Sequence, residues 1–371
     1  MKVRELVERF EQYAPKQIAE PNDPVGLQIG SLDAEIHNVM TTLDVRPEVV
    51  QEAIDNNIDF IFAHHPVMFR PAKNLDLSNP QNKMYADLIQ HHITVYAAHT
   101  NLDSANNGLN DWLAEALQLV DTTGLVPGYT EAIYSLTVQA PKIYANAVQM
   151  SLVDAGAEIT ADGSSGYTFQ WDGLIQYVTP LGVQPGASAV ETPAEQDNTR
   201  IEFEVSEGHL TDVLKALYDV HPLDQPIYHL VKLDDHRLQY SMGRIGKLRQ
   251  SMTVKELAEL CKKTFKVNGL RVVANELDRS VQTVAILGGD GGKFYHIAKQ
   301  KGADVYITGD VYYHTGHDML ASDLPVIDPG HHIESICKPK LAQLIKQWAS
   351  ENDWSLQVAE SQINTDPFTF I

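Results

Sequence analysis

The sequence predicts an α/β protein, in which a discontinuous α/β core of two related halves is interrupted by an inserted ferredoxin-like α+β domain. Apolar strand-like runs alternate with helical runs near both ends of the chain, as in βαβ units. From about residue 131 to residue 240 this order changes. The length of 371 residues suits two domains or one domain with an insertion. We therefore expect a core at 1–128 and 241–371 and an insert at 129–240.

The N-terminal part contains strand, helix, strand successions of the length that builds parallel sheets. The expected elements are a strand at 38–45, a helix at 46–57, a strand at 59–65, a helix at 83–92, a strand at 93–103 and a helix at 106–117. Asn56 and Asn57 close the first of these helices, since asparagine favours turn conformations.

The middle part follows the β, α, β, β, α, β order of ferredoxin-like domains. Its expected elements are a strand at 133–141, a helix at 146–156, an irregular β stretch, a strand at 199–205, a helix at 210–220 and a strand at 227–233. The stretch 182–198 is rich in Gly, Pro, Ala and polar residues and is typical of a surface loop.

The α/β order returns after Tyr240. The expected elements are a helix at 251–265 that begins at a Ser/Thr cap, a strand at 281–287, a glycine turn at 288–292, a helix at 293–302 and a strand at 303–310. The glycine turn GGDGGK lacks two positions of the Walker pattern, because Leu287 and Phe294 stand where Gly and Ser or Thr are required. A turn that needs a positive φ is the expected structure.

Composition limits the function. The chain has 28 Lys and Arg against 49 Asp and Glu, a formal net charge of -21, so direct nucleic-acid binding is not expected. No apolar segment approaches the ~20 residues that cross a bilayer, and the N-terminus has no signal-peptide core. Only Cys261 and Cys337 occur, which fits a reducing cytoplasm and nearly excludes thiolate metal sites.

Four polar clusters stand where apolar strands end, and ligands in open α/β sheets bind at the carboxyl ends of strands. The clusters are His64 and His65, His99 and Asp103, Asp310 and His314, and His331, His332 and Glu334. Imidazoles and carboxylates without sulfur suit a divalent metal such as Zn, Mn, Fe, Co or Ni. The clusters therefore predict a metal site.

Spacing indicates how these residues would share ions. His331 and Glu334 should open a helix, where residues three apart lie on one face and can reach one ion. His64 and His65 are adjacent on a strand end and should point to opposite sides, so each could hold one of two ions.

Each cluster also has a structural interpretation. A strand-end histidine commonly caps or hydrogen-bonds, and the doublet His91-His92 at a helix end is assigned to that class. Asp103 could cap the helix near residue 106, and Asp310 could cap the segment after it. Cys337 is expected in the core. Several polar groups buried together without partners would be costly, which favours the metal site for the combination.

The motifs, taken together, resemble the Nif-three-like family of dinuclear metal-binding proteins, whose members often carry the label GTP cyclohydrolase I type II homologue. The resemblance runs over almost the whole chain. Its motifs are LDVRPEVVQEAI, FAHHPVMFRP, AHTNLDSANNGLNDWLA, GRIGKL, VAILGGDGG, GADVYITGDVYYH and VIDPGHHIE, in the family's order. The insert looks like the domain related to PII and CutA proteins that longer bacterial members carry.

The resemblance implies a ligand set. It makes His64, His65 and His331 ligands of two divalent metals, with Asp103 and Glu334 as the carboxylates that bridge them. Zinc is the first expectation, and iron and manganese are alternatives. It also implies a toroidal homohexamer in the cytoplasm.

The implied activity is hydrolysis with a metal-activated water, at the C8 carbon of a purine nucleotide or in another nucleotide or phosphoester. His99 or His314 would move the protons, although either could instead orient a ligand from outside the metal's immediate shell. The alternative is a regulatory protein that binds metal and senses a small molecule without turnover.

Overall fold

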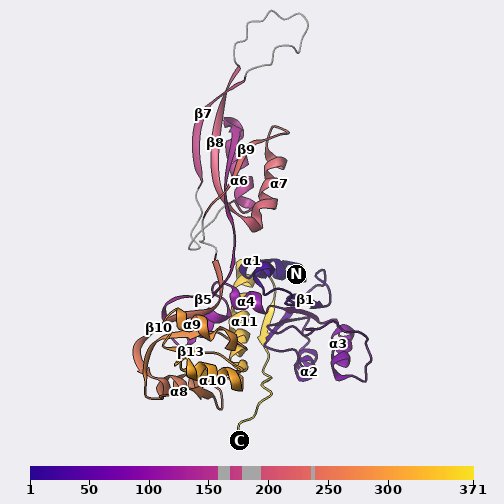
Figure 1. Cartoon of the computed structure of the whole chain (residues 1–371). Helices are drawn as coiled ribbons and strands as arrows, with labels where there is room; N and C mark the ends of the chain where they lie inside the picture. The colour runs from indigo at the N-terminus through magenta and orange to yellow at the C-terminus, as the bar shows by residue number, and fades with distance from the viewer. Residues whose placement is uncertain (158–167, 178–193, 235–238) are drawn as a thin grey trace, which may run out of the picture. The chain divides into compact units, whose positions relative to one another are not determined.

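The computed structural model describes residues 1–157, 168–177, 194–234 and 239–371, which form two compact units (Figure 1). Unit 1 comprises Met1–Tyr129 and Tyr240–Ile371, and unit 2 comprises Thr130–Gln239. The order of helices and strands is mixed α/β throughout the described chain.

Unit 1 contains a five-stranded sheet, here called sheet 1, with the order β1-β4-β3-β2-β15. Its strands are β1 (Gly26–Ile29), β2 (Asn38–Thr42), β3 (Phe60–Ala63), β4 (Thr94–Ala97) and β15 (Gln357–Glu360). Strands β2, β3 and β4 pair in parallel, β15 is parallel to β2, and β1 is antiparallel to β4. The parallel sheet predicted for the N-terminal part is therefore confirmed.

Helices cover both faces of sheet 1. The helices around this sheet are α1 (Val3–Tyr13), α2 (Pro47–Asp55), α3 (Pro80–Gln90), α4 (Thr100–Ser104), α5 (Leu109–Ala116) and α11 (Cys337–Glu351). Along β3, Phe60 and Phe62 belong to the core cluster that contains residues of α1, α5 and α11. Ile61 and Ala63 belong to a second cluster with residues of α2 and α3. Strand β3 is buried on both faces, which explains its unbroken apolar sequence.

Unit 1 also contains a six-stranded sheet, here called sheet 2, with the order β11-β14-β13-β12-β10-β5. Its strands are β5 (Val120–Thr130), β10 (Gln239–Thr253), β11 (Arg271–Val273), β12 (Ser280–Ile286), β13 (Val305–Ile307) and β14 (Val326–Asp328). The helices between these strands are α8 (Val254–Thr264), α9 (Tyr295–Gln300) and α10 (Tyr313–Ala321). Strands β12, β13 and β14 are parallel. Both sheets thus have three consecutive parallel strands whose carboxyl ends can carry a site.

The helix ends, the glycine turn and the buried cysteine agree with the sequence predictions. Helix α8 begins at Thr253, whose hydroxyl accepts from the backbone N–H of Glu256. Helix α2 ends at Asn56 and Asn57, and Asn57 has a φ of 52°. The glycine turn has its positive φ at Gly289, 64°. Cys337 is fully buried in the core.

Unit 2 has the topology of a split βαβ domain. Its elements are β6 (Ile133–Pro141), α6 (Ala145–Asp154), β7 (Phe169–Tyr177), β8 (Ala194–Ser206), α7 (Leu210–Val220) and β9 (Ile227–Lys232). The four strands are all antiparallel to their neighbours, in the order β7-β8-β6-β9. Helices α6 and α7 pack on one face of this sheet through a core of their own (Figure 1). The order of helices and strands in unit 2 is that of an α+β fold.

The loop predicted at 182–198 lies mostly outside the described residues. Its last five residues, 194–198, belong to β8, so that end of the prediction is wrong. The reason is the pairing of β8 with β7, whose ladder extends to the pair of Tyr177 with Ala194.

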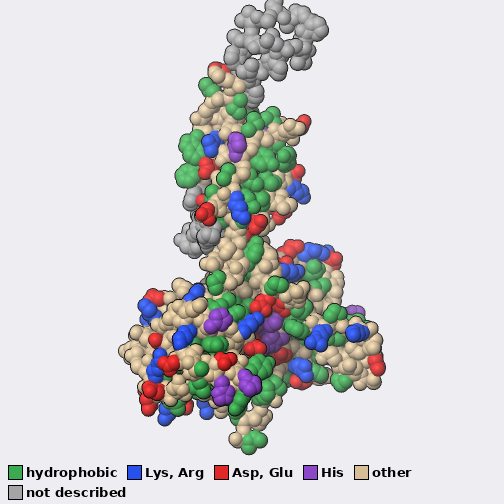
Figure 2. Space-filling model, in the orientation of Figure 1, with side chains coloured by type: hydrophobic (Ala, Val, Ile, Leu, Met, Phe, Trp, Pro, Cys, Tyr) green, Lys and Arg blue, Asp and Glu red, His purple; other side chains and the backbone are tan. Residues whose placement is uncertain are grey.

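Surface charge and helix length limit which partners this protein can have. On the face shown in Figure 2, acidic and basic side chains intermingle over unit 1. Every helix within the described ranges is too short or too polar to cross a membrane.

Candidate metal centre

The candidate ligands lie at the carboxyl ends of strands from both sheets of unit 1. Strands β3 and β4 are paired in register and end side by side; His64 and His65 follow the first, and His99 follows the second. From sheet 2, β14 leads into His331 and Glu334. The two sheets therefore bring residues separated by more than 260 positions into one cluster.

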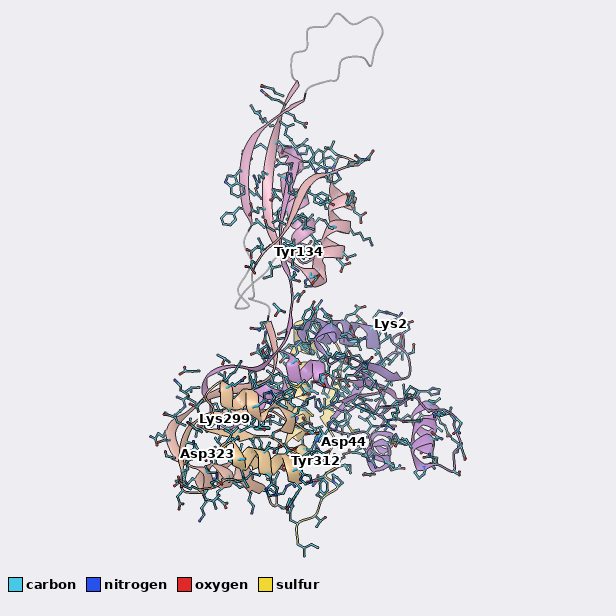
Figure 3. All side chains as sticks on the ribbon, viewed as in Figure 1. Lys2, Asp44, Tyr134, Lys299, Tyr312 and Asp323 are labelled. Carbon is cyan, nitrogen blue, oxygen red and sulfur yellow. The ribbon has the colours of Figure 1, made fainter. Side chains whose placement is uncertain are left out.

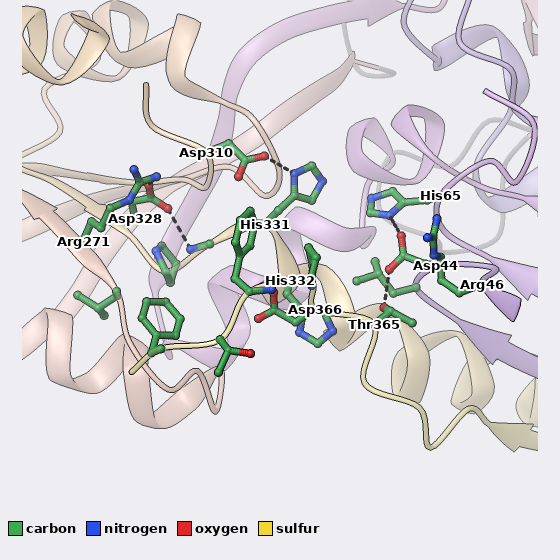
Figure 4. Close-up of a pocket in the computed structure, with 18 residues that line it drawn as sticks. Asp44, Arg46, His65, Arg271, Asp310, Asp328, His331, His332, Thr365 and Asp366 are labelled. Atoms are coloured by element: carbon green, nitrogen blue, oxygen red, sulfur yellow. Dashed lines mark hydrogen bonds and ion pairs between the residues drawn. The ribbon is translucent and has the colours of Figure 1, made fainter. Parts of the chain in front are cut away.

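Each of these four histidines has its Nδ1 atom held by an oxygen that can only accept a hydrogen bond. The pairs are His64 Nδ1 with the Ala98 carbonyl (2.7 Å), His65 Nδ1 with Asp44 (2.7 Å), His99 Nδ1 with Asp23 (2.8 Å) and His331 Nδ1 with Asp310 (2.7 Å). Figure 4 shows the pairs of His65 and His331. A metal-binding histidine typically donates its other ring N–H in this way, which fixes the ring and presents Nε2 to the ion.

The three carboxylates among these partners are poised as acceptors. The pKa of Asp44 and that of Asp23 are lowered although burial opposes it, because each accepts hydrogen bonds from its histidine and from a threonine. The hydrogen bond from His331 lowers the pKa of Asp310. All three are ionised at neutral pH, so the histidine Nδ1 atoms carry the hydrogens.

The Nε2 atoms converge on two carboxylates. His65 Nε2 and His331 Nε2 each lie 3.1 Å from Glu334 Oε2, and His64 Nε2 lies 3.6 Å from the same oxygen. His64 Nε2 also lies 3.5 Å from Asp103 Oδ1. A single oxygen of Glu334 is therefore shared by three imidazoles.

Two of these atoms are buried without a hydrogen-bond partner, His64 Nε2 and Asp103 Oδ1. Burial of an unpaired polar atom is costly, and native structures rarely tolerate it. Both atoms are good ligands for a divalent cation of borderline hardness. An ion between them would satisfy both, so the residues present fit a metal.

The cluster perturbs the pKa values of its members in opposite directions. Burial and the negative charge of Glu334 raise the pKa of Asp103 well above its usual range. Burial also opposes ionisation of Glu334, but hydrogen bonds from His331 and His65 outweigh it, and the pKa of Glu334 falls well below its usual range. Burial lowers the pKa of His64 to about 3.

Two histidines are cationic at neutral pH in the absence of metal. Burial favours the neutral rings, but hydrogen bonds to Asp44 and Glu334 raise the pKa of His65 to about 9. Hydrogen bonds to Asp310 and Glu334 likewise raise the pKa of His331 to about 11. Both rings then donate an Nε2–H to Glu334, and a metal ion would have to replace these protons.

The potential ligands fall into three overlapping groups, in each of which the ligand atoms lie within 4.8 Å of one another. The groups are His64, His65 and His99; His65, His331 and Glu334; and His64, Asp103 and Glu334. Glu334 belongs to two groups and Asp103 to one. The cluster can therefore hold a metal ion, and its overlap offers more than one position for it.

The expectation that His64 and His65 point to opposite sides is wrong. Strand β3 ends at Ala63, and the doublet lies in a bend where the alternation of a strand no longer applies. The two rings are 5.0 Å apart and both face Glu334.

The spacing argument for His331 and Glu334 is correct, although the element differs from the one expected. Residues His331–Ile336 form a 3-10 helix, and helix α11 begins only at Cys337. In a 3-10 helix, residues three apart lie directly above one another, so the two side chains still meet.

The glycine turn lies against this cluster and leaves room for Glu334. A Cβ atom at Gly288 or Gly289 would lie 2.9 or 2.8 Å from Glu334 Oε1. Any side chain at these two positions would therefore displace the shared carboxylate. The absence of side chains at Gly288 and Gly289 therefore leaves space for the Glu334 carboxylate.

The two predicted catalytic histidines differ in placement. His99 lies in the cluster, with its ring 5.4 Å from that of His64 and 5.5 Å from that of His65. His314 lies in the first turn of α10, exposed, with its ring against Tyr313. Within the described residues it joins none of the three groups. Tyr312, the N-cap residue of α10, is labelled in Figure 3.

The capping alternatives are wrong for both aspartates. Helix α5 has Gly108 at its N-cap, without a side-chain cap bond, and Asp103 lies inside α4. Helix α10 has Tyr312 at its N-cap, and Asp310 bonds His331 instead.

Sequence reasoning missed Asp23 and Asp44, which hold His99 and His65. Asp44 directly follows the apolar strand β2 and could have been found as one more polar residue at a strand end. Asp23 lies in a turn-rich segment 76 residues before His99, where nothing in the sequence connects the two.

A cavity of about 740 Å³ opens beside the cluster within unit 1 (Figure 4). His65 and His331 line it, together with His332 and the C-terminal residues 365–370. Its volume is that of a small-molecule site.

The protein is thus an α/β protein with a candidate metal centre, which lies where the carboxyl ends of parallel strands from two sheets present histidines and carboxylates. A sequence model of the Duf34/NIF3 (NGG1p interacting factor 3) family matches residues 1–367, so the chain belongs to this family. The resemblance found in the sequence motifs is confirmed.

Relatives of known sequence match over nearly their whole length. A Listeria innocua protein named GTP cyclohydrolase 1 type 2 homolog is 40% identical over 362 residues, which are 97% of this chain and 96% of that protein. A Bacillus subtilis protein of the same name is 38% identical over 368 residues, 99% of this chain and 98% of that protein.

Solved structures show the same fold. The crystal structure of a Bacillus cereus protein related to NIF3 matches with a TM-score of 0.90 and 37% identity, over 100% of this chain and 99% of that chain. A Staphylococcus aureus protein matches with a TM-score of 0.78 and 28% identity over the same shares.

Proposed function

We propose that this protein is a hydrolase that uses two divalent metal ions and acts on a nucleotide or related phosphorylated compound. The observation that carries the proposal is the buried, unpaired pair His64 Nε2 and Asp103 Oδ1 beside a carboxylate shared by three imidazoles. Such an arrangement is costly without a cation and favourable with one.

The groups suggest how two ions would be held. His64, Asp103 and Glu334 would bind one ion, and His65, His331 and Glu334 would bind the other. Glu334 would be the common ligand, and Asp103 could bridge as the family resemblance implies. Nitrogen and oxygen donors without sulfur favour zinc, with iron and manganese as alternatives.

Two bound ions would supply Lewis acidity and lower the pKa of a water molecule. The chain's own residues would then position the substrate and move protons. His99 suits the second task, because its ring is partly exposed and Asp23 orients it. For His314 no such role is proposed, since it lies outside the cluster.

The nucleotide class rests on the relatives, which are named GTP cyclohydrolase 1 type 2 homolog. In a reaction of that kind, water opens a purine ring at C8. The cavity beside the cluster has room for a nucleotide, which supports this class.

We also propose the domain assignment: unit 1 as the metal-binding core and unit 2 as a PII/CutA-like domain. The βαββαβ order and antiparallel sheet of unit 2 support it. Its sheet exposes Phe169 and Trp171 on strand β7, 52% and 49% exposed, which suits burial in a homohexamer. A cytoplasmic location fits the two free, buried cysteines.

The test is turnover of GTP by the purified protein loaded separately with zinc, manganese and iron. The proposal expects product with at least one metal and none from Asp103→Ala, with His91→Ala as a matched control that retains activity. Two bound ions without turnover of GTP or other nucleotides would favour the sensing alternative and contradict the hydrolase.

A further inference from the structure

The cavity beside the metal cluster has two arginines in its wall, Arg46 and Arg271 (Figure 4). Arg271 is the first residue of β11 and forms an ion pair with Asp328. Asp328 is buried and also accepts from the backbone N–H groups of Val311 and Gly330, so it is a fixed anchor. The Arg271 side chain is 64% exposed and keeps donors for a ligand.

Arg46 stands at the N-cap position of helix α2 and is exposed. Among the residues that the structure describes, it forms no ion pair. It also follows Asp44, the partner of His65, by two positions, which places it near the metal cluster. A charged donor without a partner in a cavity wall suits an anionic ligand.

Four acidic side chains also line the cavity: Asp44, Asp310, Asp328 and Asp366. Asp44 pairs with His65, Asp310 pairs with His331, and Asp328 pairs with Arg271. The remaining acid, Asp366, accepts the backbone N–H of Phe368 and attracts His332. Of the two arginines, Arg271 is matched by one carboxylate, whereas Arg46 forms no ion pair with any described residue and suits an anionic ligand.

The C-terminal segment 365–370 forms the rest of the wall. Thr365 donates to Asp44, and Ser361 donates to Glu52, so the segment is tied to unit 1 where it enters the cavity. The Phe370 ring lies over Gly269, where an added Cβ would approach it to 2.5 Å.

Two aromatic rings of this segment remain available. Phe368 and Phe370 are 70% and 52% exposed although both line the cavity. Flat rings of this kind can stack on a planar heterocycle.

We propose that this cavity binds a phosphorylated compound with a planar ring, with the phosphate on Arg46 and Arg271 and the ring against Phe368 and Phe370. This inference rests on the proposed function in one respect: the bound ligand would be the substrate, and it would reach the metal cluster at His65 and His331, which line the cavity. It assigns the two arginines and the C-terminal segment to substrate binding.

The first arm of the test is calorimetric binding of GTP and guanosine to the metal-loaded full chain. We expect GTP to bind roughly tenfold or more tightly than guanosine, since hydrogen bonds to charged groups are strong. The double variant Arg46→Ala, Arg271→Ala should lose this preference. Arg279→Ala is the matched control, because Arg279 is partly exposed and pairs with Asp323 outside the cavity.

The second arm examines the ring. Phe368→Ala with Phe370→Ala should weaken GTP binding several-fold and leave binding of inorganic triphosphate unchanged. Gly269→Ala should act in the same direction, because it displaces the Phe370 ring without touching a candidate ligand of the metals.

Elemental analysis of the same samples separates this inference from the proposed function. A wild-type protein without metal would count against the proposed function, whereas loss of GTP binding in the arginine variant would still support the site. No GTP binding to the wild type, equal affinities for GTP and guanosine, or unchanged GTP binding in the arginine variant would overturn the inference, even with two metals bound.

Discussion

Two of the three histidine doublets of unit 1, His64-His65 and His91-His92, have the same sequence but very different surroundings. His64 and His65 follow strand β3, and their rings are held by Ala98 and Asp44. His91 and His92 end helix α3, and both are exposed. Among the described residues, neither of these two rings forms a hydrogen bond or an ion pair.

The second doublet has a conformational role. His91 is the C-cap of α3, and His92 has a φ of 55°, which reverses the chain before β4. A doublet by itself is therefore no evidence for a metal site. What distinguishes His64 and His65 is their place at the shared carboxyl edge of parallel strands, opposite Glu334.

The largest expected effect is the loss of zinc affinity on substitution of the doublet His64-His65. His64→Asn and His65→Asn should each reduce zinc affinity by more than about 100-fold, because each would remove a direct ligand of the proposed centre. Dialysis against a zinc buffer series followed by elemental analysis measures it.

His91→Asn and His92→Asn are the matched controls, and their metal content should equal that of the wild type. Equal metal loss from both doublets would break the comparison.

The second effect is the pH dependence of metal binding. His65 and His331 have raised pKa values, about 9 and 11, so both rings are protonated at neutral pH and protons compete with metal. Affinity should rise with pH, by roughly 100-fold per unit near pH 7 if about two protons leave.

Calorimetry in buffers of different ionisation enthalpy counts these protons. The Asp103 carboxyl, whose pKa is raised, would add to the count wherever it is still protonated. Metal binding without proton release would contradict the assignment of His65 and His331 as ligands.

The third effect concerns the residues that orient the rings. Asp44→Asn and Asp310→Asn should each weaken metal binding by roughly 10- to 100-fold while leaving the ligands in place. Asp33→Asn is the control, since Asp33 is an exposed partner of Arg4. No change in either variant would mean that the Nδ1 bonds do not matter for binding.

Much of this could be predicted from the sequence, because strand ends and short spacings are local features. The run FIFA before His64 identifies a buried strand, and its end places the doublet. The three-residue step from His331 to Glu334 predicts a shared face in either kind of helix. The α/β alternation around both segments predicts parallel strands, at whose carboxyl ends these residues lie.

The remaining features depend on distant pairings. Asp23 reaches His99 across 76 residues, and Asp44 reaches both His65 and Thr365. His99 lies two residues after the end of β4, whereas His314 lies seven residues after the end of β13, in the exposed first turn of α10. Sequence spacing gives the end of a strand but not the direction of the next side chain.

The smallest effect tests the link between the cluster and the C-terminal segment. Thr365→Val removes the hydroxyl that donates to Asp44 but keeps the side-chain shape. Metal affinity should fall less than about tenfold, since one neutral donor is lost from an outer carboxylate. A loss as large as that of Asp44→Asn would mean that Thr365, rather than Asp44, controls the position of His65.

The central claim is that Glu334 is shared between two ions held by His64 and His65. Anomalous diffraction from crystals of the zinc-loaded protein tests it most directly. The account predicts two peaks roughly 3.5 to 4 Å apart, one beside His64 and Asp103, the other beside His65 and His331, with Glu334 between them. A single peak, or none within reach of Glu334, would contradict it.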